Sequence, residues 1–279
     1  MSVTLGTDPE IFLRDSRTGG VVPVCGLIGG DKGKPVSMGG GFGVQEDNVM
    51  LEFNTPASDS PEGFMRCVQI GVEKCADLIR VRQPHLELDN QAERLFTHQQ
   101  LDDPRANRFG CSPDFDGHNH GEAHAALSRD VLRDDGGEWR FAGGHVHLGF
   151  APKYDVPKWV AAAFGDVFLG LSAVGCDKQV RRRALYGAPG RFRPTKYGIE
   201  YRTLSNFWVQ EHAYLDQVAY RAYALGTFLE GATEARMHKL FREIPWADVR
   251  SAMNTGDESR AADVAAHIRH DLGMTEIDL

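Results

Sequence analysis

Polar side chains recur at every second position in four segments that otherwise resemble strands. Residues two apart in a strand point to the same face of a sheet, so each segment gathers its polar groups on one face. That face cannot be apolar core, because burying unpaired charge costs too much free energy. If the four strands are neighbours in one sheet, the shared face is a hydrated or metal-filled cleft. The positions are Asp8 and Glu10; Glu46, Asn48 and Glu52; His145 and His147; and Glu200 and Arg202.

The segment 143–149, Gly-Gly-His-Val-His-Leu-Gly, is the most informative of the four. It places two imidazoles on one face beside open backbone, with Val146 and Leu148 on the other face. Each of the other segments, taken alone, is equally well explained as a surface turn, an edge strand or a salt bridge. Carboxylate oxygens with one imidazole suit Mg²⁺ or Mn²⁺, whereas zinc prefers more His or Cys ligands.

A group of basic residues follows in the last third of the chain. Arginine side chains present a planar fork that matches phosphate and carboxylate oxygens, and they stabilise charge in phosphoryl transfer. Three successive arginines in a helix cannot all face one way, so at most two of the first three can reach a site. The group consists of Arg181, Arg182 and Arg183, and then Arg191, Arg193 and Lys196 in a Gly/Pro-rich stretch.

The periodicity predicts one α+β domain over 1–279, with an antiparallel-rich sheet, helices packed on it and a helical C-terminal third from about 210 to 279. Ser60-Pro61-Glu62 has the pattern of a helix start. Residues 84–137 show little periodicity. Strands are expected within 3–5, 11–14, 21–24, 44–54, 139–150 and 199–204, and helices from 61, over 156–174 and 177–186, and at about 210–230, 234–253 and 258–272.

Composition excludes several classes of protein. Lys and Arg total 31 and Asp and Glu total 39, so the net charge is −8, which is a poor match to a phosphate backbone. The five cysteines include no CxxC pair, which argues against a disulfide framework or a zinc ribbon. No secretory signal or membrane span is visible, so we expect a cytoplasmic protein. The sequence also lacks GxxxxGK[ST] and GxSxG, which argues against a P-loop and an α/β-hydrolase.

A second set of candidate zinc ligands lies in the irregular region. Cys111, His118, His120 and His124 are seven, two and four residues apart, which fits no standard structural zinc site. A loop that faces the substrate is the preferred interpretation of this segment.

In this order, the segments resemble the carboxylate–amine ligases of the glutamine synthetase and glutamate–cysteine ligase superfamily, and especially the phage-encoded carboxylate–amine ligase family. The likeness covers roughly residues 3 to 208. It rests on the segments 6–12 (GTDPEIF), 46–56 (EDN to EFNTP), 109–115 (FGCSPDF), 143–149 (GGHVHLG) and 197–202 (YGIEYR).

This resemblance implies a curved antiparallel sheet of the glutamine synthetase catalytic-domain type, with helices on its convex face and with ATP and Mg²⁺ or Mn²⁺ on its concave face. It implies that Glu10, Glu46, Glu52, Glu200 and one of His145 and His147 hold the metals. The basic residues would hold phosphates or the substrate carboxylate. We assign Arg202, Arg191 and Arg182 to the reacting groups, and Arg181, Arg183, Arg193 and Lys196 to the nucleotide.

The expected activity is therefore an ATP-dependent ligase that forms an amide or peptide bond through an acyl phosphate. Its substrates would be small-molecule or peptide carboxylates and amines: free amino acids, polyamines, a peptide or protein terminus, or a modified base in phage DNA, which the acidic net charge disfavours. We expect a monomer or homodimer, in the host cytoplasm if the chain is phage-encoded. The alternatives are a metal-dependent hydrolase, in which the His-x-His pair and the carboxylates activate water, and a binding protein without catalysis.

Overall fold

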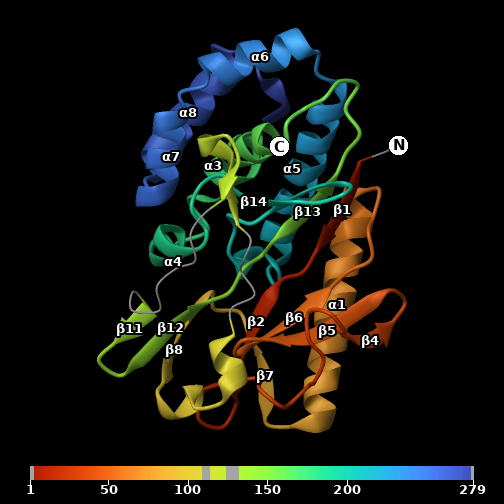
Figure 1. Ribbon diagram of the computed structural model, residues 1–279, viewed down its shortest axis with the longest axis vertical. Coiled ribbons are helices and arrows are strands. Elements are labelled where there is room, and N and C mark those ends of the chain that lie inside the picture. The colour runs from red at the N-terminus through yellow and green to blue at the C-terminus, as the bar shows by residue number, and fades with distance from the viewer. Residues whose placement is uncertain (1–2, 109–113, 124–131, 278–279) are drawn as a thin grey trace.

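The computed structural model describes residues 3–108, 114–123 and 132–277, and within them the chain is a mixed α+β structure (Figure 1). Every strand pairing in these ranges is antiparallel. The strands are β1 (Thr4–Thr7), β2 (Glu10–Asp15), β3 (Val21–Val22), β4 (Val36–Gly39), β5 (Phe42–Asp47), β6 (Met50–Asn54), β7 (Leu86–Asp89), β8 (Glu93–Thr97), β9 (Phe115–Asp116), β10 (Glu122–Ala123), β11 (Arg133–Asp134), β12 (Gly137–Phe141), β13 (Val146–Gly149), β14 (Arg191–Pro194) and β15 (Gly198–Tyr201).

Helices and helical turns make up most of the remaining described chain. No helix among the described residues is both long enough and apolar enough to cross a membrane. The α-helices are α1 (Pro61–Arg82), α2 (Lys158–Gly165), α3 (Leu171–Ala173), α4 (Val180–Leu185), α5 (His212–Gly231), α6 (Glu234–Glu243), α7 (Trp246–Thr255) and α8 (Glu258–His270), with a π-helical turn η5 (Asp166–Gly170) between α2 and α3. The 3₁₀ turns are η1 (Gln99–Leu101), η2 (Pro104–Asn107), η3 (Gly117–Asn119), η6 (Asn206–Trp208) and η7 (Thr275–Ile277).

The strands form three sheets. An upper sheet has the order β1-β13-β15-β14-β9-β10, and a lower sheet has the order β3-β2-β6-β5-β4, with β7 paired to β2. A small sheet, β11-β12-β8, lies at the lower left of Figure 1. The expectation of one sheet that carries all four polar segments is therefore wrong, because β1, β13 and β15 belong to the upper sheet and β2, β5 and β6 to the lower sheet.

The upper and lower sheets meet where the chain passes from β1 to β2 through Asp8 and Pro9. The segment that follows Glu52 runs along both strands: Phe53 N–H donates to Pro9 O (3.3 Å), Thr55 N–H to Thr7 O (3.1 Å) and Leu5 N–H to Ser58 O (2.7 Å). The two sheets are thus joined by backbone hydrogen bonds at this junction, and polar residues from both sheets lie beside it.

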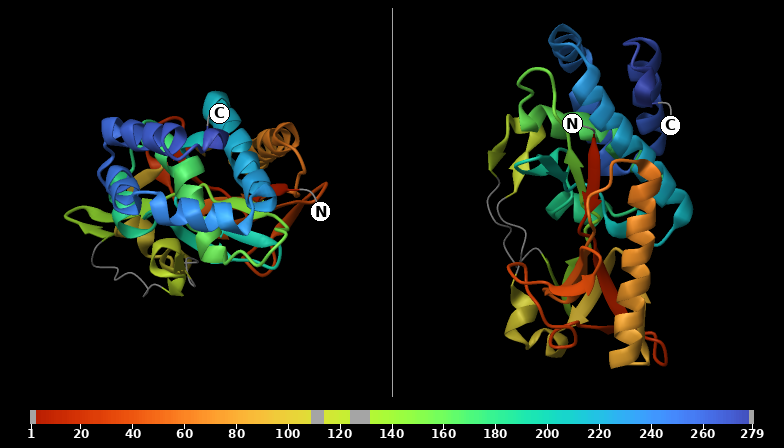
Figure 2. Two further views of the ribbon diagram at one scale, coloured as in Figure 1. Left: turned by 90° about the horizontal axis from the view of Figure 1, so that it is seen from above. Right: turned by 90° about the vertical axis from the view of Figure 1, so that its right-hand side faces the viewer.

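Helices cover one side of the strands. In the right-hand view of Figure 2, α1 and α5 lie together on one side of the strands. Ser60 caps α1 by accepting from Gly63 N–H, as the Ser-Pro-Glu pattern predicts. Val146, Leu148 and Tyr201 are at most 2% exposed and belong to the main hydrophobic core. Alternation along β13 and β15 therefore turns His147 and Glu200 to the opposite face, as the sequence pattern predicts.

Three predicted elements are divided. The segment 139–150 forms two strands, β12 and β13, which lie in different sheets, because the chain changes direction at Gly143-Gly144. Only glycine fits at position 144, since a Cβ there would lie 2.3 Å from Ser205 O. The segment 234–253 forms two helices, α6 and α7, because Pro245 has no N–H to continue a helix. The helix predicted over 156–174 contains the π-helical turn η5.

Candidate active site

A first group of polar side chains lies on the face of the upper sheet that points away from the hydrophobic core. The register of β13 and β15 places His147 opposite Glu200. His145 Nδ1 lies 3.3 Å from Asp8 Oδ1 and 3.6 Å from Glu200 Oε1, and His147 Nε2 lies 3.0 Å from Asp8 Oδ1. The structure thus brings both histidines to one carboxylate at the junction of the sheets. We call Asp8, His145 and Glu200 the upper group.

Asp8 and the neighbouring His147 shift each other's pKa. Burial alone would raise the pKa of Asp8, but the two imidazoles, His147 above all, hold that pKa well below its usual range. Burial would lower the pKa of His147, and the adjacent Asp8 carboxylate raises it above its usual value. Asp8 and His147 therefore each favour the charged form of the other in a site that is largely shielded from water.

A second group lies on the lower sheet. Glu10 on β2 stands directly opposite Glu52 on β6, and Asp47 at the end of β5 completes the set; one carboxylate oxygen from each of the three lies within 4.8 Å of the other two. Glu10 and Glu52 are 7% and 6% exposed. Burial first, and then the neighbouring carboxylates, raise the pKa of Glu52 well above its usual value, and burial raises that of Glu10. This lower group, Glu10, Asp47 and Glu52, is a buried concentration of like charge.

Both groups have the chemistry of a divalent-cation site. Asp8 Oδ1 and Glu200 Oε1 are buried, and their contacts with His147 Nε2 (3.0 Å) and Arg202 Nε (3.1 Å) lack the geometry of a hydrogen bond. Buried polar atoms normally have partners, and closely packed carboxylates normally need a counter-charge. Oxygen-rich ligand sets with one imidazole fit Mg²⁺ or Mn²⁺. The residues present therefore fit the expected ions, and their role as ligands stays a prediction.

Glu46 does not join the lower group, although the sequence analysis predicts it as a metal ligand. Its carboxylate accepts N–H groups from Gly26 (2.9 Å), Ile28 (2.9 Å) and Gly29 (2.7 Å) on the opposite side of the hairpin. The strands pair Glu46 with Leu51 and Gln45 with Glu52, so counting by twos from Glu52 back across the turn reaches the wrong face. Asp47 lies on the same face as Glu52 and occupies the position in the lower group that was predicted for Glu46.

Replacing Glu46 with Gln is therefore expected to reduce stability without affecting cation binding. Hydrogen bonds to a charged acceptor contribute about 1.5–3 kcal/mol each, and the amide keeps only part of this contribution. Urea unfolding measures the lost free energy, and Mn²⁺ titration followed by electron paramagnetic resonance measures binding. Weaker Mn²⁺ binding in a stably folded variant would restore Glu46 to the metal site.

Basic residues flank the upper group. Arg193 NH1 lies 3.0 Å from Glu200 Oε2, and Arg202 Nε lies 3.1 Å from Glu200 Oε1. Asp114, at the start of the segment that leads into β9, lies 3.4 Å from Arg202 and 3.7 Å from Arg191. Three of the predicted arginines are thus brought together with Glu200, and Asp114 is an additional acidic residue that the sequence analysis did not select.

The other predicted basic residues have different surroundings, and only one of them lines the pocket that contains Arg202. Arg182 is buried, donates to Thr203 O (2.5 Å) and lines the same pocket as Arg202. Arg183 donates to Asp177 O (2.6 Å), and Arg181 lies over the Trp139 ring, 4.1 Å from its centroid. Lys196 is exposed and lines a separate cavity. The nucleotide role predicted for Arg181 and Arg183 is not supported, since both side chains are engaged outside the pocket.

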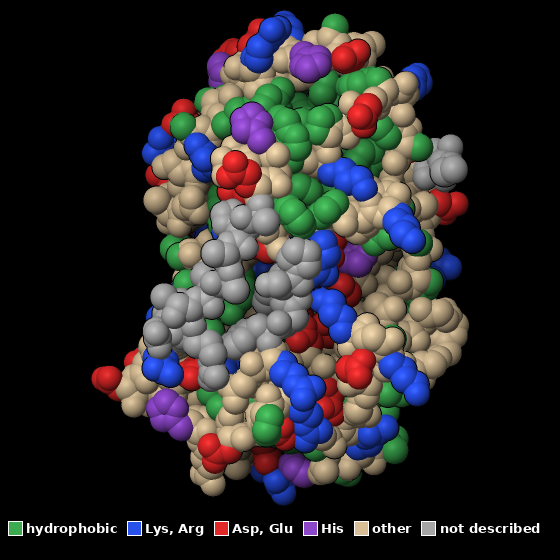
Figure 3. Space-filling model, viewed as in Figure 1, with side chains coloured by type: hydrophobic (Ala, Val, Ile, Leu, Met, Phe, Trp, Pro, Cys, Tyr) green, Lys and Arg blue, Asp and Glu red, His purple; other side chains and the backbone are tan. Residues whose placement is uncertain are grey.

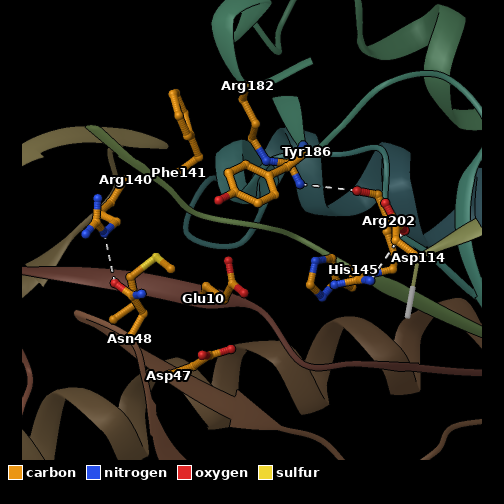
Figure 4. A pocket seen from close by; sticks show the side chains of 11 residues that line it. Glu10, Asp47, Asn48, Asp114, Arg140, Phe141, His145, Arg182, Tyr186 and Arg202 are labelled. Carbon is orange, nitrogen blue, oxygen red and sulfur yellow. Dashed lines mark hydrogen bonds and ion pairs between the residues drawn. The ribbon is translucent and has the colours of Figure 1, made fainter. Parts of the chain in front are cut away.

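Members of both groups line a common pocket. Its lining includes Glu10 and Asp47 of the lower group and His145 of the upper group, together with Arg182 and Arg202 (Figure 4). Acidic and basic side chains also gather at the middle of the face seen in Figure 3, between the upper and lower halves of the molecule. A second cavity of about 250 Å³ lies on the far side of His147, between β1 and residues 54–57, and its lining has no charged residue apart from that imidazole.

Only two of the four candidate zinc ligands, His118 and His120, lie among the described residues, and they contact different partners. Cys111 and His124 lie outside the described residues. His118 contacts Asp166 on the helical side of the upper sheet, and His120 packs against Trp159.

Comparison with known families assigns the class of protein. The family described as phage phiEco32-like COOH.NH2 ligase-type 2 matches residues 138–276, about half of the chain. The chain belongs to this phage carboxylate–amine ligase family, which confirms the resemblance seen in the sequence motifs. The match includes His145, His147, Glu200 and the basic residues, whereas Asp8 and the lower group precede it. No curated protein matches the chain.

Proposed function

We propose that the chain is an ATP-dependent carboxylate–amine ligase that works through an acyl phosphate, with Mg²⁺ or Mn²⁺ held by the upper and lower groups, and that the upper and lower sheets together form a catalytic domain of the glutamine synthetase type. Family membership gives the general reaction, the joining of a carboxylate and an amine. The observation that carries the rest is the pocket in which Glu10 and Asp47 of the lower group and His145 of the upper group lie together with Arg182 and Arg202.

The chemistry requires both kinds of charge. A carboxylate resists attack by an amine, because its oxygen is a poor leaving group. Transfer of the γ-phosphoryl group of ATP to that oxygen releases ADP, and attack of the amine nitrogen on the carbonyl carbon then expels phosphate as the amine loses a proton. Divalent ions, when bound, neutralise charge on the phosphate oxygens.

The residues of the chain divide this work. Arg202 and Arg191, which are both paired with Asp114, would hold the acidic oxygens of the substrate or of the transferred group. Arg182 would fix the same region from above, since its guanidinium is anchored to the carbonyl groups of Thr203 and Arg202. The uncharged cavity beyond His147 offers room for the nucleoside, and the Tyr197 hydroxyl contacts His147 Nδ1 at its edge (2.7 Å).

The decisive experiment measures ADP release with panels of carboxylic acids and amines in the presence of Mg²⁺ or Mn²⁺. We expect release that needs an acid, with an amide product found by mass spectrometry. When the acid carries ¹⁸O in its carboxylate, one ¹⁸O atom should appear in the released phosphate, because the carboxylate oxygen leaves with phosphorus.

Two outcomes would overturn the proposal. Phosphate without ¹⁸O, in a reaction that still forms the amide, would exclude the acyl phosphate. Hydrolysis of amides or esters without any nucleotide, together with no ADP release across the panel, would favour the metal-dependent hydrolase.

A further inference from the structure

A carboxylate that plays no part in the cleft lies buried on the other side of the upper sheet. Asp166, at the start of η5, is fully buried. Its Oδ1 accepts the Tyr201 hydroxyl (2.6 Å), and its Oδ2 contacts His118 Nε2 (2.5 Å). Burying a carboxylate costs free energy unless it is hydrogen-bonded. The folded chain therefore favours the conformation in which Asp166 keeps its contacts with Tyr201 and His118.

The chain around Asp166 is shaped to receive Tyr201. A Cβ on Gly165 would lie 2.8 Å from the Tyr201 ring, and one on Gly170 would lie 3.0 Å from its hydroxyl. The two glycines therefore form a slot for this side chain, and Asp166 meets the hydroxyl within it. The slot coincides with the π-helical turn, and such turns occur often at functional sites.

Tyr201 connects Asp166 to the candidate active site through one strand. It lies between Glu200 and Arg202, whose side chains point to the cleft while its own points to the core. The hydrogen bond from the Tyr201 hydroxyl to Asp166 therefore anchors β15 from the core side of the sheet.

His118 connects Asp166 to the segment that carries Asp114. Within the described residues, this segment pairs with β14 at Phe115 and Asp116, and Gly117 N–H donates to Gly190 O just before β14. Register is weakly specified in so short a strand, and a slip by one residue turns every side chain to the other face. The His118 ring is packed against Trp246, with the ring centroids 5.3 Å apart. The contact of His118 with Asp166 is thus a second anchor that a slipped register would break.

We propose that Asp166 is a positioning residue that locks the segment 114–121 in register with β14 and β15, and thereby holds Asp114 against Arg202 and Arg191. The lock itself follows from the contacts of Asp166. Its consequence for catalysis rests on the proposed function.

The lock is tested without substrate by hydrogen–deuterium exchange. Tyr201→Phe removes only the hydroxyl, and His118→Phe keeps a ring against Trp246. We expect each change to speed exchange about tenfold or more at the Gly117 and Gly121 amides, since native opening free energies vary locally. These amides donate to Gly190 O (2.8 Å) and Asp116 O (2.8 Å).

Two surface pairs provide matched controls. Tyr220→Phe removes a tyrosine–carboxylate hydrogen bond to Glu62 of the same length (2.6 Å), and His267→Phe removes a histidine–carboxylate contact to Asp271 (2.7 Å). Neither control should change exchange in 114–121. Unchanged exchange at Gly117 and Gly121 in folded Tyr201→Phe and His118→Phe would overturn the lock, whatever the activity of the protein.

Steady-state kinetics tests the consequence. In His118→Phe we expect KM for the carboxylate to rise about tenfold, because Asp114 no longer holds Arg202 and Arg191 in place, while KM for ATP stays unchanged. A variant that merely folds less well loses active molecules and keeps its KM values. Faster exchange with an unchanged KM for the carboxylate would overturn the link to catalysis, and absence of ligase activity in the unmodified protein would count against the proposed function alone.

Discussion

Replacing Glu200 with Gln is expected to reduce acid-dependent ADP formation by about 10²–10³-fold, the usual loss when one well-placed electrostatic group is removed. Glu200 is 3% exposed, faces His145 and is paired with Arg193 and Arg202. The amide keeps the size of the side chain but removes its charge from the upper group and from both arginines. The measurement is ADP release at saturating Mg²⁺, with thermal melting to confirm that the variant is folded.

Glu87→Gln is the matched control for this change. Glu87 is a half-exposed carboxylate that pairs with Arg14 (2.8 Å) on the lower sheet, away from the pocket. It should keep full turnover. Near-normal ADP formation by Glu200→Gln would remove Glu200 from the reaction and leave its ion pairs as a structural feature.

Replacing Glu52 with Gln is expected to weaken Mn²⁺ binding by about 10–100-fold, the order of loss seen when the surroundings of a metal are altered, and yet to stabilise the metal-free protein at alkaline pH. The pKa of Glu52 is raised in the folded protein, first by burial and then by the charges of Asp8, Asp47 and Glu10. In the pH range between the unfolded and the folded pKa, the folded state binds a proton that the unfolded chain does not.

The sign of the pH effect follows from this difference. As pH rises above 4.5, the ordinary value for Glu, and towards the raised folded value, the metal-free protein loses stability because the folded state must give up that proton. Glutamine has no proton to lose, so the variant should melt at higher temperature than the unmodified protein in chelator, and the difference should widen with pH. Added Mn²⁺ should raise the melting temperature of the unmodified protein most at high pH.

Glu87→Gln again serves as the control, with melting and Mn²⁺ binding unchanged. If the melting temperatures of the Glu52→Gln variant and the unmodified protein changed with pH in parallel, the pKa of Glu52 would not be raised in the folded protein. Unchanged Mn²⁺ affinity would place the cation elsewhere in the pocket.

Periodicity predicted the orientation of residues within each strand, because alternation is a local property of extended backbone. Val146, Leu148 and Tyr201 are buried, and His147 and Glu200 face the cleft. The same rule failed across the hairpin, where Asn48, with φ of 57°, and Val49 form a two-residue turn between Asp47 and Met50. Placing that turn first would have selected Asp47 instead of Glu46.

Long-range placement was harder to predict. Gly143-Gly144 shows in the sequence only as two small residues, whereas in the structure the chain crosses from one sheet to another there. The arginine run likewise does not reveal that Arg182 lines the pocket while Arg183 binds Asp177, since both side chains are buried and differ only in their partners. The role of Asp166 depends on contacts 48 and 35 residues away in the chain, which local patterns do not encode.

The passage from β1 to β2 has a consequence for the spacing of any bound ions. Asp8 belongs to the upper group and Glu10 to the lower group, and only Pro9 separates them. Successive Cα atoms are about 3.8 Å apart, and the proline ring fixes one of the few rotations between the two carboxylates. A tilt of one sheet against the other would therefore alter the shape of the pocket, while the tripeptide would keep Asp8 and Glu10, and any cations bound to them, at a nearly constant separation.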